Sequence, residues 1–329
     1  MSLLEIRDLR IDYRTESGVL RAVDDVSLVV ERGDAVGVVG ESGCGKSTLG
    51  LAIPLLLAPN ATVAGGSIRL DGTSIADLDE RQLNRLRWTT VSFIFQGAMN
   101  ALNPVQRIDQ QILEAIRIHE PETSTATARA RVVELLGLVG IAPSRAASYP
   151  HEFSGGMRQR AMIAMALACQ PALVIADEPT TALDAISQDQ ILQLLRDLRR
   201  RRGQGLIMIS HDLAAITRVC DRIVVMYAGV IVETGTTADV LGRRDAALGT
   251  IHPYTRALLD AHPDLHGPRV LAPGLSGHPP DLARPIVGCR FADRCAHATD
   301  HCRAVVPALV AVSRDHDVRC HFAVAERVT

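Results

Sequence analysis

The segment from residue 40 to residue 48 has the composition of a phosphate-binding loop. It reads Gly-Glu-Ser-Gly-Cys-Gly-Lys-Ser-Thr and fits the pattern G-x-x-x-x-G-K-[ST], in which glycines let backbone N–H groups turn toward phosphate oxygens. A helix that starts at the end of the loop would add the positive end of its dipole. Lys46 would contact the β- and γ-phosphates, and the Ser47 hydroxyl would ligate Mg²⁺. The residues expected to hold the nucleotide here are Gly40, Ser42, Gly43, Gly45, Lys46, Ser47 and Thr48.

Lys46 also stands out in the composition of the chain. Of the 35 Lys and Arg residues it is the single lysine, and the others are all arginine. An ammonium group is a compact point charge, whereas a planar guanidinium is too bulky for a glycine-lined loop. Phosphate binding therefore explains why lysine is present at this one position.

Two adjacent acids could complete the site. Four apolar residues, 173–176, are followed directly by Asp177 and Glu178. Asp177 is placed to reach Mg²⁺, either directly or through water. Glu178 is placed to orient and deprotonate the water that attacks the γ-phosphate. The pair predicts hydrolysis of the bound nucleotide.

A sheet must bring these groups together. Residues 35–39 are apolar and largely β-branched, which predicts a buried central strand directly before the loop. Alternating apolar and polar residues near the amino terminus predict an antiparallel strand. The strand segments expected are 4–11, 26–30, 35–39, 173–176 and 206–209, with a hairpin formed by 222–227 and 230–233.

Helical spacing separates these strands. Apolar residues recur at helical intervals within 112–118 and 130–138, and Ile191, Leu195 and Leu198 mark one stripe of an amphipathic helix, together with Leu194. Strands that alternate with helices predict an α/β core with a mainly parallel sheet, interrupted by a helical insertion. The four arginines at 199–202, followed by Gly203, are typical of a helix carboxyl terminus rather than a nucleic-acid site.

Composition excludes several classes of protein. The 329 residues carry a formal net charge of −2, with 47% hydrophobic and 22% charged residues, which excludes bulk disorder and argues against a protein that coats nucleic acid. No apolar run approaches the ~20 residues of a membrane span. The amino terminus lacks the layout of a signal peptide. We therefore expect a cytosolic chain with reduced cysteines, unless a metal holds them.

Several further motifs carry a family resemblance. They are Phe-Ser-Gly-Gly-Met-Arg-Gln-Arg at 153–160, Thr-Thr-Ala-Leu-Asp at 180–184, Ser-His-Asp at 210–212, Phe-Ile-Phe-Gln at 93–96, and Tyr13. In this order, together with the loop and the acid pair, they resemble the nucleotide-binding subunits of ATP-binding-cassette (ABC) transporters. The resemblance covers about residues 3 to 235. It implies a P-loop NTPase core of the ABC type, with an antiparallel β subdomain and a helical insertion, followed by a Cys-rich carboxyl-terminal extension.

The resemblance implies a role for each motif. Tyr13 would stack on adenine, His211 would contact the γ-phosphate, and Gln96 would contact Mg²⁺ or its water and relay nucleotide occupancy to a membrane partner. With Glu178, the residues His211 and Gln96 form the expected catalytic group. The signature loop would complete the ATP site of a second subunit, so that ATP lies between two subunits. The residues of that contact would be Ser154, Gly155, Gly156 and Asp184.

Three stretches resemble one branch of the family, the oligopeptide, dipeptide and nickel importer ATPases. They are residues 99–104, residues 252–259 and a tail with four cysteines. Met157 is usual in that branch, whereas Gly97-Ala98 departs from it. The resemblance implies an ATPase at the cytoplasmic face of the membrane that powers peptide uptake. Its partners would be a second ABC ATPase subunit, identical or related, two permease subunits and an extracytoplasmic solute-binding protein, with no nucleic acid.

The tail cysteines suggest a metal. Cys289, Cys295, Cys302 and Cys320 have the spacing C-x5-C-x6-C-x17-C, which matches neither paired zinc knuckles nor a ferredoxin run. Four thiolates could hold a [4Fe-4S] cluster or tetrahedral Zn²⁺ in a structural role, and empty thiols or a disulfide are the third alternative. The branch resemblance favours the cluster. The other cysteines, at 44, 169 and 220, are expected to be packing residues.

We expect an ABC nucleotide-binding domain at residues 1–235, with a helical subdomain at about 97–165, and a carboxyl-terminal extension at 236–329. A Pro- and Gly-rich stretch at 266–288 is expected to be a linker or loop. A soluble, non-transport ABC ATPase is the rival interpretation, but it would need coiled-coil arms, a second cassette or another accessory domain. A purely regulatory cassette would lack the catalytic acid, whereas Glu178 is present.

Overall fold

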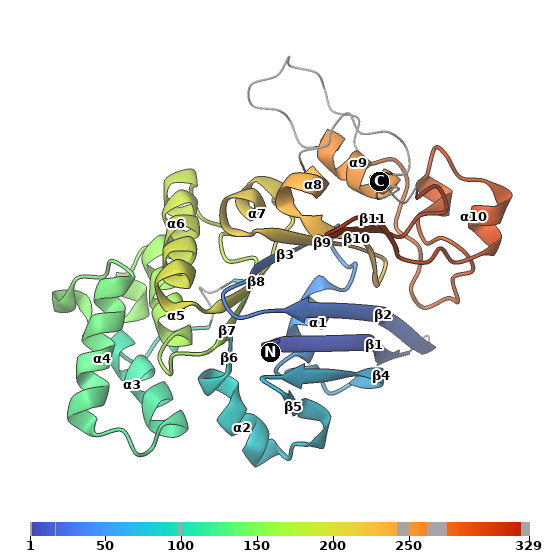
Figure 1. Ribbon diagram of the computed structural model, residues 1–329. Helices are drawn as coiled ribbons and strands as arrows, with labels where there is room; N and C mark the ends of the chain where they lie inside the picture. Colours follow the sequence, from blue (N-terminus) through green and yellow to red (C-terminus); the bar gives the residue numbers. More distant parts are fainter. Residues whose placement is uncertain (1, 17, 98–100, 242–249, 262–274, 324–329) are drawn as a thin grey trace.

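A computed structural model describes the chain except for residues 1, 17, 98–100, 242–249, 262–274 and 324–329. Its strands form two sheets (Figure 1). The smaller sheet is antiparallel and has the order β2-β1-β4-β5. Its strands are β1 (Leu4–Thr15), β2 (Gly18–Val30), β4 (Ala61–Leu70) and β5 (Thr73–Ser74).

The larger sheet has the order β11-β12-β10-β9-β3-β8-β7-β6. The strands from β9 to β6 are parallel, and β10, β12 and β11 extend the sheet in antiparallel fashion. The α/β fold with a mainly parallel sheet and an antiparallel subdomain is therefore confirmed. The strands are β3 (Ala35–Val39), β6 (Val91–Ile94), β7 (Leu173–Asp177), β8 (Gly205–Ile209), β9 (Arg222–Tyr227), β10 (Val230–Thr236), β11 (Val310–Ser313) and β12 (His316–Val318).

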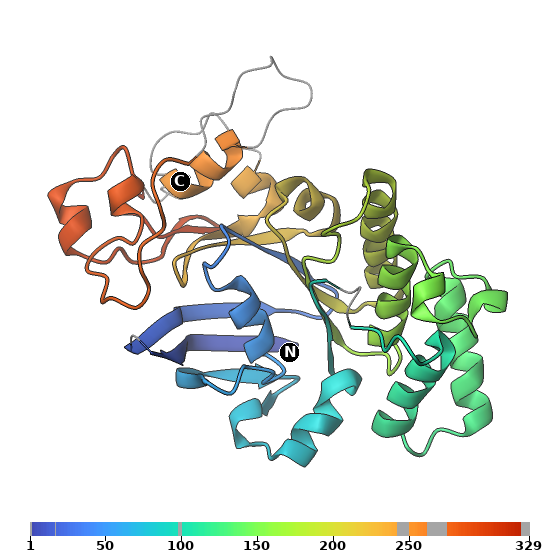
Figure 2. The same ribbon diagram turned by 180° about the vertical axis from the view of Figure 1, so that it is seen from behind.

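Helices cover the larger sheet and extend beyond both of its edges. The segment with α3 and α4 lies beyond the β6 edge, and the segment with α10 lies beyond the β11 edge, as both views show (Figures 1 and 2). The helices are α1 (Lys46–Ala52), α2 (Glu80–Thr89), α3 (Ile108–His119), α4 (Thr125–Leu138), α5 (Gly155–Ala166), α6 (Ala185–Arg202), α7 (Leu213–Val219), α8 (Thr237–Leu241), α9 (Pro253–Ala261) and α10 (Asp300–Ala304). Within the described residues, no helix is long and apolar enough to span a membrane.

Two apolar cores hold the layers together. One lies between the two sheets and includes Leu49 of α1, Ile6 of β1 and Ile175 of β7. The other joins the opposite face of the larger sheet to α3 through α7 and reaches Phe291 in the extension. Successive residues of β3 alternate between the two cores, because side chains of a strand point to opposite faces in turn. This explains why all five residues of β3 are buried.

The strongest periodic segments are confirmed. Residues 35–39 form β3 with the expected bounds, and the segments 173–176 and 206–209 lie in β7 and β8. The hairpin forms with Val230 opposite Tyr227. Helix α6 ends at Arg202. Gly203 follows as its cap, with a φ of 63° and an N–H bond to the Arg199 carbonyl, as predicted.

Other elements differ from the expected ones. The two amino-terminal strands are longer than the segments 4–11 and 26–30, because they pair along almost their whole length. Strand β4 and helix α2 have no expected counterpart. β4 contains two adjacent glycines and many exposed residues, so that its strand character comes from pairing with β1 rather than from its own apolar pattern.

The extension continues the sheet of the core. β12 pairs with β10 at Glu233 and Thr234, and β11 pairs with β12. The expected boundary at residue 235 falls inside β10, so the division into two domains stays a prediction. The described part of the expected linker, 275–288, contains no helix or strand, and the remainder lies outside the described residues, as do positions 98–100 of the branch motifs.

Candidate functional site

A cleft of about 730 Å³ lies at the ends of β3 and β7, against the antiparallel sheet. It brings together most of the residues singled out in the sequence. Those that line it are Tyr13, Ser42, Gly43, Gly45, Lys46, Ser47, Thr48, Gln96, Asp177, Glu178 and His211.

The backbone conformation of the loop and its close packing both require glycine. Gly40, Gly43 and Gly45 all have positive φ, at 151°, 79° and 102°. A Cβ at Gly40 would also collide with the carbonyl oxygen of Met226, and one at Gly45 with that of Ala22. Only glycine combines this backbone with this approach. The loop turns from β3 into α1, so that the helix begins at the cleft.

Lys46 is held across the loop. Its side chain is buried, and Nζ donates hydrogen bonds to the carbonyl oxygens of Gly40, at 2.8 Å, and Glu41, at 2.9 Å. Gly40 itself does not line the cleft. Cys44 is buried beneath the loop, and burial raises the pKa of its thiol, which agrees with a packing role. The arrangement presents one cation to the cleft.

Asp177 retains an unused acceptor. The carboxyl group is buried, and its Oδ1 atom has no hydrogen-bond partner within the described residues. Burial raises the pKa of Asp177, and a hydrogen bond from Ser47 opposes the shift. A buried carboxylate oxygen without a partner is unfavourable unless a cation neutralises it. With Ser47 and Gln96 in the same cleft, the oxygen donors fit Mg²⁺.

Glu178 and His211 face each other at the cleft. His211 donates its backbone N–H to Glu178 Oε1 at 3.0 Å, and its Nδ1 lies 2.7 Å from the same oxygen. Thr181 donates to Oε2 at 3.1 Å. Glu178 has a φ of 48°, a conformation that is uncommon for a residue with a side chain and concentrates at functional sites. The carboxylate is thereby fixed toward the nucleotide side of β7.

The antiparallel sheet supplies the remaining wall. The Tyr13 hydroxyl lies 3.2 Å from Thr48 Oγ1, which ties β1 to the start of α1. Four further lining residues carry no local signal in the sequence, because only the approach of this sheet to the loop brings them to the cleft. They are Thr15, Leu20, Ala22 and Asn60.

The signature residues form a separate group. Ser154 caps the amino terminus of α5 by accepting a hydrogen bond from Met157 N, and Asp184 caps α6 by accepting bonds from the N–H and hydroxyl of Ser187. These bonds lower the pKa of Asp184. A Cβ at Gly156 would lie 2.8 Å from Ser187 Oγ, so the two helix starts are in contact. Ser154, Gly155, Gly156 and Asp184 do not line the cleft.

The four tail cysteines do not form the expected ligand set. Cys289, Cys295, Cys302 and Cys320 are free thiols. Within the described residues, no group of three or more His, Cys, Asp or Glu side chains converges so as to hold a metal ion. Cys289 and Cys295 also pack against the larger core. Burial raises the pKa of Cys289 to about 11, with a smaller contribution from the thiols of the other three tail cysteines. The expectation of a [4Fe-4S] cluster or zinc is therefore not supported by the structure.

Two further cysteines, Cys169 and Cys220, lie just after the ends of α5 and α7 and behave as the predicted packing residues. Cys169 and Cys220 are buried, and burial raises the pKa of each thiol, for Cys169 to about 12. Both stay protonated and act as apolar packing groups.

Two family profiles match the chain. Residues 23–181 match "ABC transporter", and residues 232–302 match "Oligopeptide/dipeptide transporter, C-terminal region". The first match contains the phosphate-binding loop and both acids. The second contains the end of the hairpin, α9 and three of the four tail cysteines.

Relatives of the chain match over nearly its full length. It is 45% identical to "Probable peptide ABC transporter ATP-binding protein y4tR" from Sinorhizobium fredii, over 97% of this chain and 94% of the relative. It is 44% identical to "Oligopeptide transport ATP-binding protein OppD" from Salmonella typhimurium, over 93% and 89%. It is 43% identical to "Probable D,D-dipeptide transport ATP-binding protein DdpD" from Escherichia coli, over 97% and 95%.

A solved structure has the same fold over the core. "Dimeric structure of a post-hydrolysis state of the ATP-binding cassette MJ0796 bound to ADP and Pi" aligns with a TM-score of 0.64 and 28% identity. The alignment covers 71% of this chain and 98% of that one. The part of this chain that the alignment does not cover lies outside the fold shared with that cassette.

Proposed function

The chain belongs to the ABC transporter family of ATP-binding proteins, and from that premise we propose that it hydrolyses ATP to power peptide import through partner permease subunits. The observation that carries the proposal is the cleft itself. It joins a buried lysine on a glycine loop, a buried carboxylate oxygen without a partner, and a glutamate fixed beside a histidine.

Each side chain has one task in the proposed cycle. The loop N–H groups and Lys46 bind the β- and γ-phosphates, and Tyr13 stacks on adenine. Ser47, Asp177 and Gln96 would hold Mg²⁺, which would neutralise phosphate charge. Glu178 orients the attacking water and accepts its proton.

His211 positions that carboxylate in the proposed cycle. Its N–H and Nδ1 both meet Glu178 Oε1, and most of its own side chain is exposed, at 69%. The imidazole can therefore turn to the γ-phosphate when ATP is present. Loss of the γ-phosphate then removes that contact.

A second ATPase subunit would complete the site. Ser154, Gly155, Gly156 and Asp184 lie together but outside the cleft of their own chain, as expected if they face the nucleotide of a partner arranged head to tail. We propose a related subunit as that partner. Light scattering of Glu178→Gln with ATP, alone and with the related subunit, distinguishes a homodimer from a mixed one.

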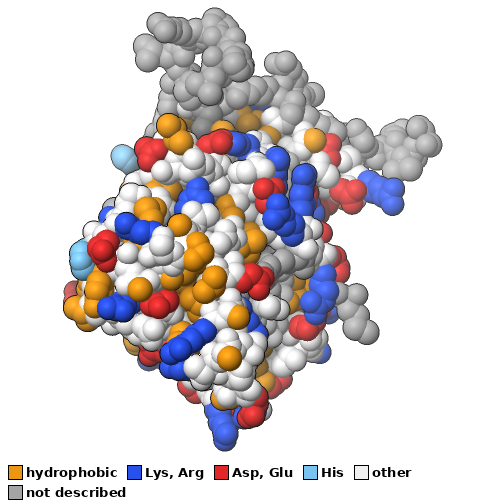
Figure 3. All heavy atoms as spheres, turned by 90° about the vertical axis from the view of Figure 1, so that its left-hand side faces the viewer, with side chains coloured by type: hydrophobic (Ala, Val, Ile, Leu, Met, Phe, Trp, Pro, Cys, Tyr) orange, Lys and Arg blue, Asp and Glu red, His pale blue; other side chains and the backbone are white. Residues whose placement is uncertain are grey.

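We propose that the permease subunits contact the side of the molecule that carries α3 and α4. Figure 3 shows hydrophobic side chains gathered among charged ones on this side. Phe95, directly before Gln96, is 44% exposed, and Val105 is 82% exposed. Apolar side chains exposed beside a nucleotide-contacting residue suit a partner whose motion follows ATP binding. The chain would then lie at the cytoplasmic face of the membrane.

Peptide uptake is the direct test of the proposal. The chain would be assembled in membrane vesicles with its permease subunits and an extracytoplasmic solute-binding protein, and uptake of labelled di- and oligopeptides would be measured with and without ATP. We expect uptake that requires ATP and an intact Glu178. If ATP drives uptake of nickel and not of peptides, nickel is the substrate. ATP hydrolysis that no permease subunit affects would favour a soluble, non-transport ABC ATPase.

The two-domain division, 1–235 with a helical part at 97–165, and 236–329, also belongs to the proposal. Separate profile matches to 23–181 and 232–302 support it.

The iron–sulfur cluster, with zinc as its alternative, remains a hypothesis that rests on the number of cysteines in the tail and on the branch resemblance. No step of the proposed cycle involves it. Iron, sulfide and zinc analysis of protein purified without oxygen decides between them, and Cys302→Ser is the matched variant that must lose any bound metal.

A further inference from the structure

The extension reaches the phosphate-binding loop at Glu41, the second residue of that loop. Arg294 forms a bidentate ion pair with the Glu41 carboxylate, with N···O distances of 2.6 and 2.9 Å. The Tyr254 hydroxyl accepts the backbone N–H of Glu41 at 2.7 Å. One loop residue is therefore held by side chain and backbone at once, by partners more than 200 positions away.

Arg294 is itself tightly constrained. Its side chain is 4% exposed, Nε donates to the Ser276 carbonyl at 2.8 Å, and Nη1 also reaches the Tyr227 hydroxyl at 3.2 Å. The guanidinium lies over the rings of Tyr227 and Phe291, 5.7 and 5.9 Å from their centroids. A planar, forked cation suits this combination of stacking and bidentate bonding, and a lysine does not.

Tyr254 is anchored by a buried polar centre. Its backbone N–H donates to His252 Nδ1 at 3.0 Å, and the N–H of His252 donates to Glu233 at 2.9 Å. Glu233 also lies 2.7 Å from His316 Nε2, with both side chains fully buried. The start of α9 is thereby fixed to β10 and β12, so Tyr254 presents its hydroxyl from a rigid support.

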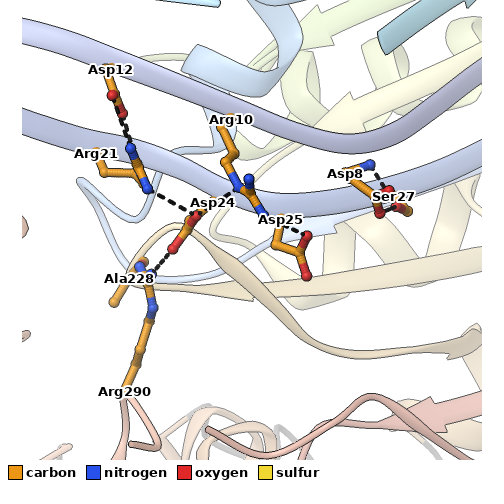
Figure 4. Close-up of polar contacts among 9 residues, drawn as sticks. All are labelled: Asp8, Arg10, Asp12, Arg21, Asp24, Asp25, Ser27, Ala228 and Arg290. Atoms are coloured by element: carbon orange, nitrogen blue, oxygen red, sulfur yellow. Dashed lines mark hydrogen bonds and ion pairs between the residues drawn. The ribbon is translucent and has the colours of Figure 1, made fainter. Parts of the chain in front are cut away.

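A second arginine supports the loop from another side. Arg290 donates to the Ala228 carbonyl and pairs with Asp24, which also faces Arg10 and Arg21 (Figure 4). The next residue after Ala228 in the hairpin turn, Gly229, donates its N–H to the carbonyl of Cys44 in the loop at 2.9 Å. The extension therefore supports the loop at two points, directly at Glu41 and indirectly at Cys44.

The charge of Glu41 makes the first contact significant. A carboxylate within a phosphate-binding loop would repel ATP if it were free to approach the phosphates. Glu41 does not line the cleft, because its side chain extends to Arg294. The ion pair neutralises the carboxylate and keeps it away from the nucleotide.

We propose that Arg294, together with Tyr254, is a positioning residue for ATP binding. Arg294 neutralises Glu41 and, with Tyr254, holds the backbone of the phosphate-binding loop in the conformation described above. This inference rests on the proposed function, since it concerns the same cleft. It makes the extension part of the nucleotide site, so that affinity for ATP depends on a segment outside the ABC cassette.

The test is a charge-rescue series in the full chain. Arg294→Gln leaves Glu41 unpaired, and we expect the Kd for ATP to rise about tenfold while kcat changes less than about twofold. Adding Glu41→Gln removes the unpaired charge, and the double variant should recover to within about threefold of the wild-type Kd. Arg303→Gln is the matched control. It breaks an exposed ion pair with Asp293, beside Arg294 in sequence, and should leave the Kd unchanged.

Two results would overturn the inference: an Arg294→Gln variant that binds ATP like the wild type, or a double variant that binds no better than Arg294→Gln. Melting curves report whether each variant is folded. If Arg294→Gln does not fold, Tyr254→Phe decides, because it removes only the hydroxyl that accepts Glu41 N–H. Its Kd should rise about threefold, and an unchanged Kd contradicts the inference.

The controls separate this inference from the proposed function. A wild-type chain that binds no ATP would refute the proposed function. Wild-type binding that Lys46→Ala abolishes, together with normal binding by Arg294→Gln, would refute the role of Arg294 alone.

Discussion

Two buried carboxylates on the same sheet are treated in opposite ways. Asp177, at the end of β7, keeps one oxygen without a partner in the described structure. Glu233, in β10, uses both of its oxygens, one toward His316 and the other toward His252 N–H. The cleft therefore keeps an uncompensated acceptor that a cation can satisfy, whereas the extension compensates its charge internally. The arrangement at Asp177 suits the binding of a cation, whereas the arrangement at Glu233 stabilises the fold.

The histidines differ in the same way. His211 in the cleft is 69% exposed in its side chain and touches a carboxylate that can change partners. His252 in the extension is buried, and burial lowers its pKa to about 3, so that it stays neutral. A histidine that responds to ligand needs freedom and solvent, which His211 has and His252 lacks.

The largest expected effect comes from a change in the cleft. Glu178→Gln keeps the hydrogen-bonding shape but removes the proton acceptor, so we expect ATP hydrolysis to fall about 10³-fold while ATP binding persists. Steady-state turnover and equilibrium nucleotide binding measure the two quantities. Gln193→Glu, on the exposed side of α6, serves as a control for a charge change. Wild-type turnover in Glu178→Gln would contradict the assigned role.

The next largest effect comes from removing the buried carboxylate that anchors the extension. Glu233→Ala leaves His316 and His252 N–H buried without their partner, and we expect the free energy of unfolding to fall by about 3 kcal/mol. Urea denaturation measures it. Asp293→Ala breaks only an exposed pair with Arg303 and should lower stability by less than about 1 kcal/mol. Equal losses in the two variants would show that Glu233 is not a structural centre.

Lys46→Arg sharpens the contrast by keeping the charge and changing only the shape of the cation. A guanidinium does not fit between the Gly40 and Glu41 carbonyls that hold Nζ, so we expect hydrolysis to fall about 10²-fold. The reverse change, Arg303→Lys, lies on an exposed surface and should leave hydrolysis unaltered. An active Lys46→Arg enzyme would mean that any cation suffices in the loop.

The smallest expected effect is a shift in pH dependence. Burial raises the pKa of Asp177, whereas the Ser187 hydrogen bonds lower that of Asp184. Mg²⁺ binding needs the charged form of Asp177, which is present above its pKa and is lost as pH falls through it. Mg²⁺-dependent ATP binding should therefore weaken at a higher pH than ordinary aspartate titration predicts. Titration of Asp177→Asn should show no such transition, and an unchanged profile in that variant would assign the effect to another group.

Local signals in the sequence were sufficient for much of the core. The glycine loop, the strand that ends in Asp177 and Glu178, and the Gly203 helix end each depend on residues within a few positions of one another. The resemblance to ABC transporter subunits added Tyr13, Gln96 and His211, which the structure places in the cleft. Their individual roles remain proposals.

The sequence by itself determined the fold class and the composition of the phosphate site, because strand burial, glycine turns and helix ends are properties of short segments. Only the tertiary structure decided that Leu20 and Asn60 line the cleft, that β12 extends the core sheet, and that Arg294 holds Glu41. Within the described residues, the structure also shows no group of tail cysteines placed to hold a metal ion. These contacts join distant segments, and with 34 arginines available no spacing rule selects the one that reaches the loop. Packing and burial make that selection, and they act on the folded chain as a whole.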